Sequence, residues 1–118
     1  MSSIDLAPTI LAACGIKQHR EMPGVNLLEA AAERPIARDA LFGEIYDHDV
    51  ADIDHADPGL LSRWCVAGQW KLILPKSGKD AELYDLSADP DEKSNLAGQQ
   101  PERVEALRIR IEEWWGKE

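Results

Sequence analysis

The residues best equipped for chemistry form one cluster of carboxylates and imidazoles near the middle of the chain. Groups of this kind, packed this closely, can bind a divalent cation or hydrogen-bond the hydroxyls of a sugar. Their spacing matches neither an EF-hand loop nor a helical pair of zinc-binding histidines. Because runs of charge are usually solvated, a solvent-exposed acidic loop is the favoured interpretation, and substrate contact and metal binding stay open as alternatives. The cluster consists of Asp47, His48, Asp49, Asp52, Asp54, His55 and Asp57.

Few other side chains stand out as candidate reactive groups. Cys14 and Cys65 lie far apart and show no metal-type pairing, so they predict neither a zinc site nor a disulfide framework. Arg63 is expected to form an internal salt bridge, with pairing to a substrate sulfate as the alternative. Trp64 and Trp70 occupy alternating strand positions, which favours packing over stacking on a sugar.

The first element that the sequence predicts is a short helix over residues 6–14. Asp5 is expected to cap this helix, Pro8 falls in its first turn, and Gly15 suits its C-terminal end. The helix is apolar on most sides, which is typical of a helix buried against a larger body. A second short helix is expected to follow residues 23–28 and to end near residue 33.

The rest of the chain predicts an antiparallel sheet of about four strands and a C-terminal helix, an α+β fold. A hairpin is expected in which residues 67–69 form the loop, with Trp64 and Val66 on one covered face together with Leu72. The helix begins at Pro101 and carries an apolar face at spacings of three and four. The expected strands span residues 40–46, 63–66, 70–74 and 82–86, and the apolar helix face consists of Val104, Leu107, Ile111 and Trp114.

The length and net charge of the chain limit the classes of function that it can have. A chain of 118 residues, 44% hydrophobic and 30% charged, is typical of one soluble globular domain. The net charge of -9 argues against binding to nucleic acid or to an anionic membrane. No apolar run approaches the roughly 20 residues of a membrane span, and the N-terminus lacks the pattern of a secretion signal. The compartment therefore stays open.

Several short motifs occur in order along the chain. They are SIDLAPTILAACGI at residues 3–16, PGVNLL at 23–28, LFGE at 41–44, WKLI at 70–73 and ELYDLSADPDEKSNLA at 82–97. Taken alone, the last motif predicts a strand that ends in a turn at Pro90. Taken together, the ordered set resembles the C-terminal part of the type I, formylglycine-dependent sulfatases of the alkaline phosphatase superfamily.

The resemblance implies where the chain divides and which part of the parent enzyme carries the catalytic groups. Residues 1–35 correspond to the junction with a catalytic domain, and residues 36–118 to the C-terminal subdomain. In this family a Cys or Ser in a C/S-x-P-x-R motif becomes formylglycine, and calcium binds in the large domain. Neither Cys14 nor Cys65 stands in such a motif. We therefore expect no catalytic residue, metal ligand or cofactor in this chain, and no hydrolysis of sulfate esters by the chain alone.

The same resemblance implies partners and one candidate contact. The expected partner is the catalytic domain of a parent sulfatase, periplasmic or secreted, whose substrate is a sulfate ester. Loops of the C-terminal subdomain can reach the rim of the active site in this family, so His48 is the preferred substrate contact, with Asp49 and His55 behind it. Without that domain, the N-terminal helix and one sheet face would be exposed, and self-association is expected.

Two alternatives stay open. Related phosphodiesterases and phosphonate hydrolases of the same superfamily end in a similar way, so the chain can instead correspond to their C-terminal tail. A stand-alone interaction or metal-binding module, with the acidic loop as its site, is the other alternative.

Overall fold

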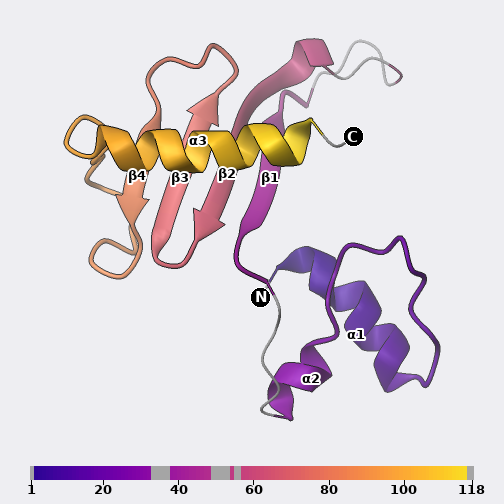
Figure 1. The fold of residues 1–118 in the computed structure, drawn as a ribbon. Helices are drawn as coiled ribbons and strands as arrows, with labels where there is room; N and C mark the ends of the chain where they lie inside the picture. Colours follow the sequence, from indigo (N-terminus) through magenta and orange to yellow (C-terminus); the bar gives the residue numbers. More distant parts are fainter. Residues whose placement is uncertain (1, 33–37, 49–53, 55–56, 117–118) are drawn as a thin grey trace. The chain divides into compact units, whose positions relative to one another are not determined.

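The structure is a computed structural model that describes residues 2–32, 38–48, 54 and 57–116. The chain divides into two compact units, Met1–Arg38 and Asp39–Glu118 (Figure 1). Over the described residues, none of the helices combines the length and the apolar character needed to cross a membrane.

The first unit is built from short helices. The predicted N-terminal helix is confirmed, and it closes with a Schellman motif in which Gly15 has a φ of 70°. In this motif the amide of Ile16 donates to the carbonyl of Leu11 at 2.8 Å, and the amide of Gly15 donates to the carbonyl of Ala12 at 3.0 Å. The elements are the 3-10 turn η1 (Ser3–Asp5) and the helices α1 (Leu6–Ala13) and α2 (Leu27–Ala31).

The second unit contains the predicted four-stranded antiparallel sheet, and the α+β fold class is confirmed. The strands lie side by side in sequence order, so every connection joins neighbouring strands (Figure 1). The strands are β1 (Leu41–Tyr46), β2 (Leu60–Ala67), β3 (Trp70–Pro75) and β4 (Glu82–Asp85), and the 3-10 turn η2 (Asp57–Gly59) precedes β2.

The hairpin between β2 and β3 differs from the sequence prediction by one residue. Ala67 pairs with Trp70, so the loop consists of Gly68 and Gln69 and not of three residues. Gly68 has a φ of 59° and Gln69 has no positive φ, and a positive φ at the first loop residue alone is the type II′ pattern. The shorter loop also shifts the register: Cys65, and not Trp64, pairs with Leu72.

This register decides which side chains form the core. Cys65 and Leu72 are fully buried on the face that α3 covers, and Leu83 of β4 continues the same row. Trp64 points to the opposite face, so its predicted place beside Leu72 is wrong. There its indole lies against Gly43 of β1, where a Cβ would stand only 2.4 Å from the ring.

The helix α3 (Pro101–Trp115) lies across the sheet, as predicted (Figure 1). It begins with Pro101 at its first turn, and its Leu107 and Ile111 are buried in the core. Each of these side chains contributes about 1.5 to 3 kcal/mol through burial. Near the end of the helix, Trp114 stacks on Phe42 of β1 with ring centroids 5.2 Å apart.

Candidate functional site

The acidic loop connects β1 to β2, and the structure describes its two ends. The backbone amide of Asp47 donates to the carbonyl of Gly59 at 2.8 Å, which closes the base of the loop. His48 is exposed at this base, two residues after Tyr46, the last residue of β1. Asp49 and His55, the two residues predicted to stand behind His48, lie outside the described residues. Their proximity to His48 stays a prediction.

The described residues offer no site for a metal ion. Within residues 2–32, 38–48, 54 and 57–116, no three His, Cys, Asp or Glu side chains converge in a way that could hold one. Both cysteines are free thiols, Cys14 exposed and Cys65 buried. Burial raises the pKa of the Cys65 thiol, which disfavours the reactive thiolate.

Arg63 adopts an arrangement that the sequence did not predict. Its guanidinium carbon lies 5.3 Å from the ring centroid of Trp115, and its Nε is buried without a hydrogen-bond partner. It forms no ion pair with any residue that the structure describes, so the expected internal salt bridge is wrong there. A cation beside the last turn of α3 is favoured by the helix dipole. Pairing of Arg63 with a substrate sulfate stays a prediction.

The polar residues of the motif at residues 82–97 bind the backbone of their own turn. The Asp85 carboxylate accepts hydrogen bonds from the amides of Ser87 and Ala88. The Asp89 carboxylate accepts from the amides of Lys93 and Ser94, both at 2.8 Å. The motif therefore acts structurally, as its strand-and-turn chemistry predicted.

One face of β3 and β4 carries a second group of titratable residues. The hydroxyl of Tyr84 donates to the carboxylate of Glu82, and this bond, together with burial, raises the pKa of Tyr84 to about 12. The neighbouring Lys71 donates to both oxygens of Glu92 at 2.8 and 2.7 Å. Each charge in this group has its partner, which favours a structural role.

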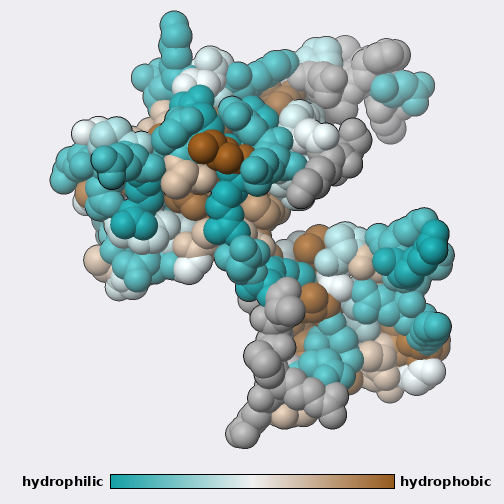
Figure 2. Space-filling view, viewed as in Figure 1, coloured by the Kyte–Doolittle hydropathy of each residue, from teal (hydrophilic) through white to brown (hydrophobic). Residues whose placement is uncertain are grey.

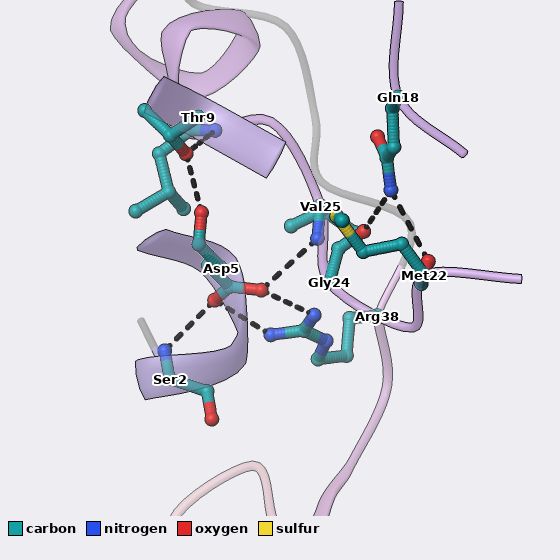
Figure 3. Close-up of polar contacts among 9 residues, drawn as sticks. Ser2, Asp5, Thr9, Gln18, Met22, Gly24, Val25 and Arg38 are labelled. Carbon is teal, nitrogen blue, oxygen red and sulfur yellow. Dashed lines mark hydrogen bonds and ion pairs between the residues drawn. The ribbon is translucent and has the colours of Figure 1, made fainter. Parts of the chain in front are cut away.

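Asp5 is the centre of a polar network in the first unit, shown in Figure 3. Its fully buried carboxylate accepts hydrogen bonds from the amides of Ser2 and Val25 at 2.8 and 3.0 Å. The guanidinium of Arg38 donates to both carboxylate oxygens, at 2.8 and 2.6 Å. These donors hold the pKa of Asp5 well below its usual range, against the opposing effect of burial.

The network corrects the predicted role of Asp5. Its side chain does not cap α1; it turns back to Ser2 and joins the start of the unit to Val25 and Arg38. One signal for this was available in the sequence, because Asp5 stands alone among apolar residues and a buried carboxylate needs a cationic partner. The sequence did not indicate that Arg38 is the arginine that pairs with Asp5.

Comparison with known proteins places these features in a family. A family model described as N-sulphoglucosamine sulphohydrolase, C-terminal, matches residues 1–114. Arylsulfatase K of Rattus norvegicus is 31% identical over 110 residues, which cover 91% of this chain and 19% of the relative. An N-acetylgalactosamine-6-O-sulfatase of Bacteroides thetaiotaomicron is 44% identical over 61 residues, covering 40% of this chain and 12% of the relative.

Solved structures agree with the fold. The structure of a 2-O GAG sulfatase superposes with a TM-score of 0.75 and 20% identity, covering 96% of this chain and 24% of that chain. At this identity the likeness concerns the fold alone. The chain spans about a fifth of the length of the curated relatives that it matches along most of its own length. Because the family model covers residues 1–114, the chain belongs to the N-sulphoglucosamine sulphohydrolase C-terminal family and is a C-terminal sulfatase domain.

Proposed function

We propose that this domain completes a sulfatase whose catalytic centre lies on a separate catalytic domain. The observation that carries the proposal is the family match over residues 1–114, combined with relatives about five times longer than the chain. The sequence has no C/S-x-P-x-R motif, and the described residues do not fit a calcium site. Formylglycine and calcium therefore belong to the catalytic domain in this proposal.

The substrate class that the proposal names is a sulfate ester. The relatives that support it, arylsulfatase K and the N-acetylgalactosamine-6-O-sulfatase, are named for sulfatase activity, and neither is a phosphodiesterase or a phosphonate hydrolase. Those two classes and a stand-alone module are therefore not favoured. The assignment of residues 1–35 to the junction with the catalytic domain, and of 36–118 to the C-terminal subdomain, belongs to the same proposal.

A chimera tests this function. The chain replaces the matching C-terminal region of Rattus norvegicus arylsulfatase K, and hydrolysis of 4-nitrocatechol sulfate is followed by absorbance. We expect the chimera to be active, and the truncated enzyme and the isolated chain to be inactive. A second chimera carrying Leu72→Asp, which places a charge in the fully buried core, should lose activity. Turnover by the isolated chain, or a chimera no better than the truncated enzyme, would contradict the proposal.

Within this function, we propose that His48 contacts the substrate, with Asp49 and His55 behind it. His48 is exposed at the closed base of its loop, which leaves its imidazole accessible to a ligand. In the active chimera, His48→Ala should lower kcat/KM about tenfold, the effect of roughly 1.4 kcal/mol of binding. His19→Ala is the matched control, because His19 is another exposed histidine in the described chain. Equal values for the two variants would remove His48 from the proposal.

The catalytic domain is also the proposed occupant of an apolar surface on the first unit. Large aliphatic side chains are exposed there, and Figure 2 shows brown patches on this unit. Leu6 and Ile10 are exposed on α1, which suits this helix to packing against another domain. The surface consists of Ile4, Leu6, Ile10, Ile16 and Leu28, each at least 44% exposed.

Without its catalytic domain, we expect the chain to self-associate through this surface. Ile10 is 61% exposed on α1, so Ile10→Glu should weaken the association. Ile109→Glu on α3, at a residue 48% exposed, is the matched control and should leave the association unchanged. Sedimentation velocity over a range of concentrations measures both. A monomeric wild-type chain at every concentration would count against this surface.

A further inference from the structure

A groove on the second unit has chemistry that the proposed function does not use. It lies between the turn of the β2–β3 hairpin and α3, and its volume is about 290 Å³. Ala67, Ala106 and Leu107 supply apolar lining, and the turn at Gly68 forms one edge. This volume is near the lower limit of small-molecule pockets, so the hairpin groove has room for a single sugar ring.

Arg103 provides an available cation in this groove. Its guanidinium carbon lies 4.1 Å from the ring centroid of Trp70, and its Nε donates to the side-chain oxygen of Gln100 at 2.8 Å. These contacts hold the guanidinium in place but occupy neither of its two terminal amino groups. No carboxylate of the described chain pairs with Arg103. A fixed guanidinium with free N–H groups is a bidentate receptor for sulfate or carboxylate.

Arg110 supplies a second polar position on the same side of α3. It stands seven positions after Arg103, which is about two helical turns and roughly 10 Å along the axis. Its guanidinium donates to one oxygen of Asp39 at 2.5 Å, and the Asp39 side chain is 90% exposed. The other carboxylate oxygen can therefore accept a hydrogen bond from a ligand hydroxyl.

We propose that the hairpin groove is an accessory site for a sugar ring that carries one sulfate or carboxylate group. Arg103 binds the anionic group, the apolar lining receives the C–H face of the ring, and the Arg110–Asp39 pair binds hydroxyls at the far end. The inference rests on the proposed function, because a sulfatase domain meets sulfated saccharides as substrate or product. The groove would hold part of such a saccharide outside the catalytic centre.

Nuclear magnetic resonance of the 118-residue chain tests the groove directly. Three probes are titrated: glucose 6-sulfate, glucose and sodium sulfate. We expect glucose 6-sulfate to shift the Gly68 amide and the Trp70 indole signal in a saturable way, and the other two probes to bind at least tenfold more weakly. The Trp70 signal is assigned with a Trp70→Phe variant. The assay contains no catalytic domain, so its result is independent of the chimera.

Variants on α3 decide whether Arg103 is responsible. Arg103→Gln should weaken glucose 6-sulfate binding about tenfold, and Arg103→Lys, which keeps the charge without the planar fork, should weaken it less. Arg108→Gln is the matched control, because Arg108 donates to the carbonyl of Gly78 in the β3–β4 loop, outside the groove.

Three results would overturn the accessory site. The first is the absence of any shift at Gly68 and Trp70 with glucose 6-sulfate. The second is equal weakening of binding by Arg103→Gln and Arg108→Gln. The third is a sodium sulfate response equal to that of glucose 6-sulfate, which would identify a general anion site and not a saccharide site.

Discussion

Replacement of Asn95 by alanine should destabilise the sheet unit more than its exposed position indicates. The Asn95 side-chain oxygen accepts hydrogen bonds from the amides of Leu83 and Ala97, at 3.1 and 2.9 Å. Its amide nitrogen donates to the carbonyl of Ala81 at 3.2 Å. The amide of Leu96 also donates to the carbonyl of Leu83 at 2.8 Å. Residues 95–97 therefore take the place of a further strand beside β4, the last strand of the sheet.

The expected cost follows from the groups that lose a partner. Leu83 is fully buried, so its unpaired amide should cost about 1 to 3 kcal/mol. The partners at Ala81 and Ala97 can reach water, and each lost bond there should cost no more than about 1 kcal/mol. We expect Asn95→Ala to lower the free energy of unfolding by about 2 to 3 kcal/mol. For a unit of this size the melting temperature should fall by roughly 10 °C or more.

Urea unfolding followed by tryptophan fluorescence measures this loss, because all four tryptophans lie between residues 64 and 115, in the sheet unit. Asn95→Asp is the matched control: it keeps the oxygen that the amides of Leu83 and Ala97 require and loses only the donor to Ala81. It should destabilise the unit by less than half as much as Asn95→Ala. A loss below about 0.5 kcal/mol in the alanine variant, or equal losses in both variants, would refute the reasoning.

Three further outcomes follow from single contacts. Gly43→Ala should lower the free energy of unfolding in urea by about 1 to 3 kcal/mol, because the added Cβ would meet the Trp64 ring. In the Trp64→Leu background the same substitution should cost less, and equal losses in both backgrounds would argue against the clash. The depressed pKa of Asp5 stabilises its unit above the unfolded pKa of about 3.9, and this stability is lost as pH falls below that value. The protection factor of the Val25 amide, which is corrected for the intrinsic exchange rate at each pH, should therefore decrease below this pH in the wild-type chain and not in Asp5→Asn; the same pH dependence in both would exclude the carboxylate. In a Tyr46→Phe variant, which leaves Tyr84 as the single tyrosine, an ultraviolet titration should show Tyr84 ionising with a pKa of about 12. The contribution of the Tyr84–Glu82 bond to stability should be lost as pH rises from 10 to 12, and a titration midpoint near 10 would contradict this bond.

Local signals made the ends of the helices predictable. Gly15 ends α1 because only a residue that tolerates positive φ completes the Schellman motif, and Pro101 begins α3 because its missing N–H is not needed in the first turn. The apolar face with Leu107 and Ile111 followed from helical spacing. Each of these features depends on residues close in the sequence, so the sequence carries enough information to place them.

The sequence did not predict in the same way which side chains of β2 face the core. A loop of residues 67–69 would pair Val66 with Trp70 and place Trp64 beside Leu72. The observed loop is one residue shorter, and a slip of one residue in a strand moves every side chain to the opposite face. The small, buried Cys65 gave no hydrophobic signal strong enough to correct the register.

The hairpin groove depends on contacts that no local pattern encodes. Trp70 belongs to β3 and Arg103 to α3, and only the crossing of the helix over the sheet brings them within 4.1 Å. The chain carries 22 acidic and 13 basic residues, so an arginine has many carboxylates available as partners. Arg38 and Arg110 each bind one, whereas the structure pairs Arg103 with an aromatic ring and leaves its terminal N–H groups open. In so acidic a protein, a fixed arginine with no carboxylate partner in the described chain is the feature that most favours an external anion.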